Sequence, residues 1–371
     1  MITGWTQTKW GMLATLEYGK ALRDYRERST GYQVFGTNGP IGWYDTAMAS
    51  GPGVIVGRKG AYRGVHFSPM PFSVIDTAYY LKPKPEAEID MSWAYFQLLT
   101  IDINRLDTGA AIPSLSRDVF YEIPVSLPPI ETQRRIASIL GAYDDLIEVN
   151  RRRIAVLEET AQGLFEEWFV RFRFPGHEQI AMVEHTPNDW HLVKVGAVLQ
   201  KFRRPAKVKK QEYEQGGIIP CIDQGADFIG GYTNNTDALI NNPLPLCVFG
   251  DHTRVIKFVT FPFASGADGT QLLHPVDDLT PEFLYFSLLN VDLSNQHYAR
   301  HFKFLKEQEI WLPARELVER FTMVVRPQMQ LIENIRFQNQ KLAASRNLLL
   351  PRLISGQLSV AEAERELKEA A

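Results

Sequence analysis

The sequence is poor in features that identify several large protein classes. Its 371 residues include only two cysteines, Cys221 and Cys247, which argues against a disulfide scaffold and a cysteine-rich zinc site. No apolar run reaches about 18 residues, the length that a membrane-spanning helix needs. The first residues do not combine a basic region with an apolar core, as a secretory signal does. We therefore expect a cytoplasmic protein that makes no membrane contact.

The common catalytic signatures are also missing. The glycine-rich stretch "VIVGRKGAYRG" (54–64) is not a phosphate loop of the nucleotide-hydrolase type, because Lys59 is followed by glycine and alanine instead of a hydroxyl residue. There is no G-x-G-x-x-G turn opening a helix, no H-E-x-x-H pair and no G-x-S-x-G elbow. We expect no catalytic residue, no metal site and no cofactor, which leaves binding as the predicted activity.

Positive charge is concentrated in a few segments. The formal net charge is −3, which excludes a uniformly basic surface but not a local nucleic-acid site. The segment "KFRRPAKVKK" (201–210) has six basic residues and no acidic one, and "GRKGAYR" (57–63) adds three more. Such patches neutralise phosphates irrespective of the overall charge.

The chain repeats itself in an imperfect but ordered way. The segment "GVIVGRKGAYRGVHF" (53–67) is echoed by "PLCVFGDHTRVIKF" (245–258), and "WAYFQLL" (93–99) by "FLYFSLL" (283–289). In each half, short β-rich segments broken by Gly, Pro and Asn precede one long helical segment. The shared order of these matches predicts an internal duplication.

Each half ends in a helix with a heptad pattern. Pro129 suits the first turn of the first helix, and residues 129–169 would span roughly 60 Å at 1.5 Å per residue. In the second helix Pro351 should weaken the last turns, and Gly356 is a plausible cap. Positions spaced alternately by four and three residues form the predicted helix-pair seam: Ile136, Leu140, Tyr143, Ile147, Asn150, Ile154, Leu157, Leu164, Trp168, Ile332, Ile335, Asn339, Leu342, Leu349 and Leu353.

We predict an α+β protein with two similar globular domains separated by two long helices, which pack as an antiparallel coiled coil with a pseudo-twofold internal repeat. The alternative is that each helix packs only on its own globular region. The polar seam residues Asn150 and Asn339 either fix the register of the pair or face a wet groove. The predicted boundaries are 1–128 and 173–313 for the globular domains, 129–172 and 314–357 for the helices, and 358–371 for a tail.

Basic and polar loop residues at matching places in the two halves are predicted to contact double-stranded DNA. Arg58, Lys59 and Arg63 are suited to phosphate, while Asn38, Arg58 and Tyr62 are candidates for reading bases. In the second half the candidate readers are Gln224, Asp251, His252, Thr253 and Arg254. The remaining candidates for DNA contact are Lys20, Arg23, Lys201, Arg203, Arg204 and Lys207.

The sequence resembles the specificity (S) subunit of Type I restriction–modification systems. The most specific part is "LPPIETQRRIASILGAYDDLIEVNRRRIAVLEETAQGLFEEWF" (127–169), and "NQKLAASRNLLLPRLISGQL" (339–358) supports it. The loop "GVIVGRKGAYRGVHF" (53–67) matches in the first half. In the second half "FGDHTR" (249–254) replaces "GRKGAYR", so its phosphate contacts do not follow from the resemblance.

The resemblance implies a non-catalytic subunit for defence against foreign DNA. Each globular domain would be a target recognition domain that reads one half of a bipartite, asymmetric DNA site. The two helices would act as spacer and dock two modification (M) subunits, which carry adenine DNA methylation with S-adenosylmethionine. Restriction (R) subunits would add ATP-driven translocation and cleavage.

Three alternatives stay open on the sequence alone. The chain is a DNA-recognition module of another defence system, or a solitary specificity subunit that pairs with a foreign M subunit. It is an enzyme that uses the glycine-rich loop as a nucleotide site. It is a two-headed protein scaffold that binds no DNA, in which case these loops are merely solvated surface.

Overall fold

The computed structural model describes residues 4–106, 113–267, 269–293 and 300–370. The chain divides into two compact units, one made of Met1–Val149 and Asn339–Ala371 and the other of Asn150–Gln338. The first unit is therefore assembled from both ends of the chain, and the second from one continuous segment. Both long helices, α4 (Ile130–Phe165) and α7 (Arg315–Ile354), pass from one unit into the other.

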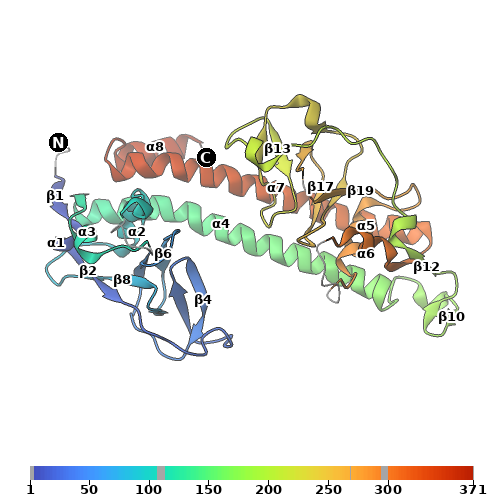
Figure 1. Ribbon diagram of the computed structural model, residues 1–371, viewed down its shortest axis with the longest axis horizontal. Helices are drawn as coiled ribbons and strands as arrows, with labels where there is room; N and C mark the ends of the chain where they lie inside the picture. Colours follow the sequence, from blue (N-terminus) through green and yellow to red (C-terminus); the bar gives the residue numbers. More distant parts are fainter. Residues whose placement is uncertain (1–3, 107–112, 268, 294–299, 371) are drawn as a thin grey trace. The chain divides into compact units, whose positions relative to one another are not determined.

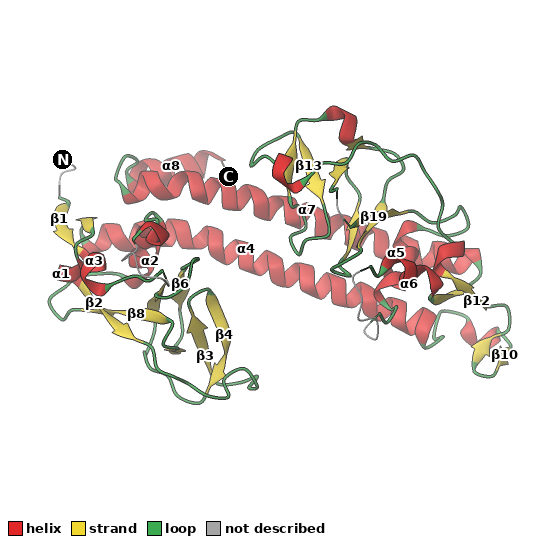
Figure 2. Cartoon of the chain, in the orientation of Figure 1, coloured by secondary structure: helices red, strands yellow, loops and turns green. Residues whose placement is uncertain are grey.

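The first unit contains two sheets and a strand pair beside the first turns of α4 (Figure 2). The larger sheet is antiparallel, with the order β2-β8-β5-β6, and the smaller has the order β4-β3-β7 with β3 and β7 parallel. Its elements are β1 (Thr6–Lys9), α1 (Trp10–Leu13), β2 (Ala14–Tyr18), β3 (Tyr32–Gly36), β4 (Gly39–Tyr44), β5 (Gly53–Gly57), β6 (Val65–Ser68), β7 (Phe72–Val74), β8 (Ala78–Pro83), α2 (Met91–Leu99), α3 (Arg117–Tyr121), β9 (Pro124–Leu127) and the C-terminal α8 (Val360–Ala370).

The second unit repeats this plan. Its antiparallel sheet has the order β17-β16-β19, and its other sheet has the order β14-β13-β18-β15 with β13 and β18 parallel. Its elements are β10 (Met182–Val183), β11 (Thr186–Pro187), β12 (His191–Lys194), β13 (Ile219–Ile222), β14 (Gly231–Thr233), β15 (Leu239–Ile240), β16 (Leu246–Gly250), β17 (Ile256–Val259), β18 (Phe263–Ser265), β19 (Thr270–Leu273), α5 (Pro281–Leu289), α6 (Phe302–Glu307) and β20 (Glu309–Leu312).

The duplication predicted from the sequence is confirmed in the order and polarity of the main elements, although the matching sheets differ by one strand. The pair β1·β9 and the pair β12·β20 have the same length and stand 185 positions apart, from Thr6 to His191 and from Pro124 to Glu309. In each unit one short helix, α2 or α5, begins with a side-chain cap, from Asp90 or Thr280. Such close matching of register, caps and strand polarity indicates one ancestral unit used twice.

Halves of α4 and α7 pack antiparallel within each unit (Figure 1). In the first unit Asp144 pairs with Arg346, and in the second Glu158 Oε1 lies 2.6 Å from Arg336 Nη2. Neither helix therefore packs only on its own globular region, so the alternative raised from the sequence is wrong. The last turns of α7 and the first turns of α4 share one core with the sheet of the first unit.

The residues predicted to form the helix-pair seam lie on the covered faces of α4 and α7. None of them is exposed, whereas Leu146 and Val156, which lie off the seam, are. Asn150 is only 2% exposed and Asn339 is half-buried, which places the first of them in the core and not in an open groove. Pro351 lies inside the last turn of α7, and Gly356 follows it with φ +72°, as expected for a C-terminal cap.

The α-helical geometry of α4 ends at Phe165, and a π-helical turn follows directly. Glu166–Val170 form a π-helical turn that carries Trp168 and Phe169 into the core of the second unit. Among the described residues, no helix is both long enough and apolar enough to cross a membrane. The boundaries predicted for the globular domains remain a prediction, because each compact unit includes halves of the long helices as well as a globular region.

Candidate nucleic-acid interface

The stretch "GRKGAYR" forms the connection between β5 and β6. The Gly57 amide donates to Gly64 O at 2.8 Å and closes the hairpin, and Gly60 has φ +114°, which favours glycine. Below the tip, the Arg58 and Lys59 amides donate to Thr77 O, at 2.9 and 3.1 Å. The loop is thus fixed through its backbone and presents Tyr62, which is 81% exposed.

Arg63 does not face solvent. Its side chain is only 4% exposed, and its guanidinium donates to the carbonyl oxygens of Gly60, Ile103 and Asn104 at 2.9, 3.1 and 3.0 Å. A buried guanidinium surrounded by carbonyl oxygens holds the loop from inside. The phosphate contact predicted for Arg63 is therefore not available to it in this structure.

Arg58 and Lys59 remain reachable from solvent, but both are held in place. Arg58 Nη1 donates to Asp76 O at 3.0 Å, and its guanidinium lies 4.8 Å from the ring centre of Tyr18. Lys59 Nζ lies 3.7 Å from Asp76 Oδ2, and its side chain is 42% exposed. An exposed ion pair of this kind contributes little to stability, so Lys59 can exchange Asp76 for a phosphate at low cost.

The other predicted residues of the first unit lie around the same turn. Lys20 forms a parallel bridge with Ile75, next to Asp76, and its side chain is exposed. Asn38 is exposed in the turn between β3 and β4, where Thr37 Oγ1 lies 2.9 Å from Lys59 O and 2.6 Å from Thr77 O. Arg23 is exposed in the segment that follows Lys20. The fold therefore brings Lys20, Asn38, Arg58 and Lys59 to one region of the surface.

In the second unit the equivalent connection, between β16 and β17, is residues 251–255. The Gly250 amide donates to Val255 O at 2.8 Å, and Arg254 has φ +62°. The loop is tied to Gln224, because the His252 amide donates to Gln224 Oε1 at 3.1 Å and Thr253 Oγ1 donates to Gln224 O at 2.7 Å. His252, Thr253 and Arg254 are exposed, and Arg254 also donates to Leu293 O at 3.0 Å.

Asp251 has a structural position instead of the predicted reading position. It is 7% exposed, and its carboxylate accepts from the Phe302 amide at 2.7 Å, at the start of α6. Its backbone oxygen also accepts from the His301 amide at 2.9 Å. A carboxylate that satisfies the free amides at a helix start is not available to a base edge.

The basic segment of the second unit is partly fixed. Arg204 donates to Gln271 Oε1 and to Leu272 O, each at 3.2 Å, and Lys207 Nζ donates to Ala267 O at 3.3 Å. Lys201 and Arg203 are exposed, as are the other four basic residues of the segment. Arg204 ties the segment to β19, and the Val208 amide donates to Ser265 O of β18 at 3.0 Å.

Several residues that organise these loops were not predicted from the sequence. Lys257 on β17 is 4% exposed, and its ammonium donates to Asp223 O at 2.8 Å and to Asp227 O. Asp223 Oδ1 accepts from the Gly225 amide at 2.8 Å, and its other oxygen from Tyr213 OH at 3.3 Å. The available signal was a lysine inside the apolar segment "VIKFV", where a charge has to be partnered.

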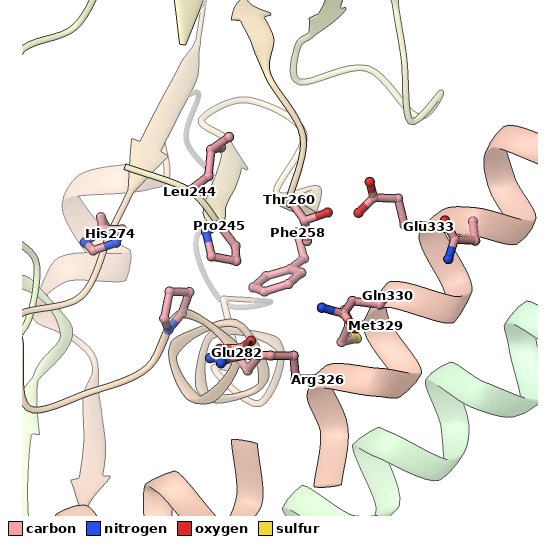
Figure 3. Close-up of a pocket in the computed structure, with 12 residues that line it drawn as sticks. Leu244, Pro245, Phe258, Thr260, His274, Glu282, Arg326, Met329, Gln330 and Glu333 are labelled. Carbon is pink, nitrogen blue, oxygen red and sulfur yellow. Dashed lines mark hydrogen bonds and ion pairs between the residues drawn. The ribbon is translucent and has the colours of Figure 1, made fainter. Parts of the chain in front are cut away.

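A cavity with a volume of about 690 Å³ lies in the second unit (Figure 3). Phe258 and Pro245 line one side, and Met329 from α7 lines the other. Glu282, only 1% exposed, is paired with Arg326, with Nε 2.6 Å from Oε1. That carboxylate is thus already engaged by a guanidinium, and Glu333 and His274 also line the cavity.

The described residues contain no group of three or more His, Cys, Asp or Glu residues that could hold a metal ion. Burial raises the pKa of the Cys221 thiol to about 11 and the pKa of the Cys247 thiol further still, so neither forms a thiolate nucleophile near neutral pH. What the two units present is a pair of backbone-fixed loops with polar and basic tips.

Known proteins resemble the chain in sequence. Residues 15–159 match the family model of the Type I restriction modification DNA specificity domain. The Type I restriction enzyme MjaIX specificity subunit of Methanocaldococcus jannaschii is 24% identical over 286 residues, which cover 68% of this chain and 65% of the relative. The EcoprrI specificity subunit of Escherichia coli is 31% identical over 122 residues, or 33% of this chain and 30% of the relative. The chain thus matches less than two thirds of the length of these relatives.

A solved structure shares the fold. The crystal structure of a Type I restriction–modification S subunit from M. genitalium superimposes with a TM-score of 0.64 over 94% of this chain and 96% of that one. The two sequences are 18% identical, so this likeness concerns the fold alone. It extends over both units, beyond the segment that the family model matches.

Proposed function

The chain carries a Type I restriction–modification DNA specificity domain and is a relative of the Type I specificity subunits, and on that premise we propose that it is the DNA-recognition subunit of such a complex. Each unit reads one half of a bipartite, asymmetric DNA site. The target recognition domains are placed at 1–128 and 173–313, and the helical regions at 129–172 and 314–357. The proposal assigns no catalytic step and no cofactor to this chain.

One observation carries the proposal. Two units of the same plan carry an equivalent hairpin loop in the same place, but the loops have different side chains at the tip. Residues 58–64 supply Arg58, Lys59 and Tyr62, and residues 251–255 supply His252 and Arg254. The common fold of the two units explains why both would bind DNA. The different side chains of the two hairpin loops explain why each would prefer a different half-site, because side chains read the edges of the bases.

The long helices are assigned two tasks, spacing and docking. A helix has a fixed rise per residue, so a helix that runs through both units can fix the distance between half-sites, as dimer geometry does in other DNA readers. Docking of M subunits is supported by Leu146 and Val149 on α4, which are 44% and 43% exposed although they are apolar. Methylation and cleavage are assigned to M and R subunits, which would bind this chain.

Exchange of one recognition domain tests the proposal. Residues 1–128 are replaced by the corresponding domain of another specificity subunit, and the complex with its M subunits is expressed in a host without other methylation. Sequencing of methylated bases should show a bipartite site in which only one half has changed. A change in both halves would contradict independent reading by the two units. The same exchange of residues 173–313 is the matched control, and it should alter the other half alone.

A further inference from the structure

Strands β6 and β17 carry a polar residue at the same position. His66 and Lys257 are each the second residue of the strand, and each stands opposite the central residue of the preceding strand, Ile55 or Val248. The neighbours in β17, Ile256 and Phe258, are apolar. A strand at this place in the sheet does not itself require an imidazole or an ammonium group.

Both side chains contact a backbone oxygen in the turn that follows the parallel strand of their unit. His66 Nε2 lies 3.2 Å from Thr37 O, and Lys257 Nζ donates to Asp223 O at 2.8 Å. Thr37 is the first residue after β3, and Asp223 is the first residue after β13. The Phe35 carbonyl oxygen accepts from the Ile75 amide and the Ile222 carbonyl oxygen from the Gly266 amide, which makes Phe35 and Ile222 the matching positions of β3 and β13. Thr37 lies two residues beyond this position and Asp223 one, so the two contacts hold the same turn through neighbouring oxygens.

The held residue is followed directly by the candidate reading residue. Asn38 follows Thr37 and is exposed, and Gln224 follows Asp223 and accepts from the His252 amide in the hairpin loop. In the first unit, Thr37 O also accepts from the Gly64 amide at 3.1 Å. The contact thus fixes the turn after the strand and the hairpin loop with respect to each other.

The side chain of Gln224 packs closely against two glycines, Gly250 and Gly269. A Cβ atom at Gly250 would lie 2.9 Å from Gln224 Cβ and 2.2 Å from Thr253 Oγ1, and one at Gly269 would lie 2.6 Å from Gln224 Oε1. A side chain at Gly250 would therefore displace Thr253 or Gln224, and Gly269 also has φ +65°, which favours glycine. Both glycines thus allow the Gln224 side chain to lie against the hairpin loop.

Burial of Lys257 has to be offset by its partners. The ammonium is removed from water, which lowers its pKa, and Asp223 Oδ1 at 3.9 Å together with the carbonyl oxygens of Asp223 and Asp227 stabilises the charge. Removing a buried cation from such a cage leaves carbonyl oxygens without donors. The turn at 223–227 would then lose the contact that fixes it to β17.

We propose that His66 and Lys257 are positioning residues for DNA reading, each of which orients the turn after β3 or β13 by donating to its first carbonyl oxygen. This inference rests on the proposed function, because it names the residues that set base preference within each half-site. The reading groups are those of the turn and of the hairpin loop. His66 and Lys257 act through them and touch no base.

The test uses the full chain with its M subunits and sequencing of methylated bases on a random-site DNA library. Lys257→Met keeps the length of the side chain but removes its donors. We expect at least about a tenfold loss of preference at one or more base pairs of the half-site read by the second unit. The half-site read by the first unit should be unchanged. His66→Phe should produce the mirror result, with loss confined to the other half-site.

Rescue separates a positioning role from general damage. His66→Gln retains a nitrogen donor near the position of Nε2 and should restore most of the preference that His66→Phe loses, whereas loss of preference in both variants would overturn the assignment of His66. Lys194→Met removes an exposed lysine of the same unit that lies outside the candidate DNA-contact segments, and it should leave every base preference unchanged. Thermal unfolding of each complex shows whether the variant is folded, and if Lys257→Met does not fold, His66→Phe and His66→Gln decide the matter.

The outcomes distinguish the inference from the proposed function. If the unaltered complex methylates no bipartite site, the proposed function fails. If it does, and folded Lys257→Met and His66→Phe complexes keep all base preferences, the proposed function stands and the positioning role is wrong. Loss of preference in both half-sites from one substitution would also overturn it.

Discussion

Arg63 and Asn104 exchange three hydrogen bonds. Arg63 Nη2 donates to Asn104 O at 3.0 Å, the Arg63 amide donates to Asn104 Oδ1 at 2.7 Å, and Asn104 Nδ2 donates to Arg63 O at 3.3 Å. The basic loop is thereby locked to a segment that follows α2. The three basic residues of "GRKGAYR" thus differ in role. Arg63 is buried and holds the loop, whereas Arg58 and Lys59 lie near the surface.

Loss of the Arg63 guanidinium should destabilise the first unit. Arg63→Met leaves the carbonyl oxygens of Gly60, Ile103 and Asn104 without their donor, and we expect the free energy of unfolding to fall by about 2–3 kcal/mol. Denaturant titration measures the change. Arg23→Met, at an exposed arginine of the same unit, should change it by no more than about 0.5 kcal/mol. If both substitutions changed the free energy of unfolding equally, the hydrogen bonds of the Arg63 guanidinium would not stabilise the first unit.

Lys59 should act on affinity without acting on sequence preference. If Lys59 contacts phosphate, Lys59→Met removes one neutralised phosphate and lowers the slope of log affinity against log salt by about 0.9 for all sequences alike. Binding titrations at several salt concentrations, on cognate and unrelated duplexes, measure this slope. Lys82→Met, at an exposed lysine on β8, is the control. An effect limited to one base pair would instead identify Lys59 as a base reader.

Lengthening both long helices should lengthen the preferred DNA spacer. Insertion of one heptad into α4 and one into α7 keeps the seam in phase and adds about 10 Å to each helix. At 3.4 Å per base pair, the spacer between half-sites should grow by about three base pairs. Sequencing of methylated bases reports the spacer directly. An insertion into only one helix breaks the pairing and should abolish methylation, whereas an unchanged spacer after the double insertion would contradict the ruler role.

His66 should contribute to the pH dependence of stability. Burial lowers the pKa of His66 below its ordinary value of 6.5, so the unfolded chain binds a proton more readily than the folded one. The resulting stability is fully present above pH 6.5 and is lost as the pH falls through the folded pKa. Denaturant midpoints of His66→Gln should therefore fall less than those of the unaltered chain between pH 7.5 and pH 5.5.

The stability of the His66→Gln variant should still depend partly on pH. Burial also lowers the pKa of His274 in the second unit, and its contribution has the same sign. The double substitution His66→Gln and His274→Gln is thus expected to have a flatter profile than either single one. A single substitution that leaves the profile unchanged would show that burial of that imidazole does not govern its protonation.

The sequence permits prediction of the features that depend on periodicity and on order. The heptad spacing identified Ile136, Leu140 and Leu353 as buried, because one face of a long helix has to be covered wherever its partner comes from. The duplication could be predicted because both halves keep the same order of short motifs. These features are encoded locally, so a single sequence suffices to find them.

The individual roles within the loops were not predictable in this way. Arg63, Lys59 and Arg58 look alike in the sequence, and only the carbonyl oxygens of Ile103 and Asn104, about forty positions later, draw one of them inside. The sequence predicts a reading residue at Asp251, because nothing nearby shows that the start of α6 needs its carboxylate. Contacts between distant segments decide which of several similar charges remains free.

The assembly of the first unit from both chain ends has a consequence for biosynthesis. A ribosome makes residues 1–149 well before residues 339–371, their partners in the same unit. Residues 150–338 form the second unit from one uninterrupted segment, so that unit can complete its core while the first still lacks Leu353 and Leu358. Until residues 339–371 have been made, the apolar side chains of the first unit that share a core with Leu353 and Leu358 therefore stay uncovered, which prolongs their exposure during synthesis.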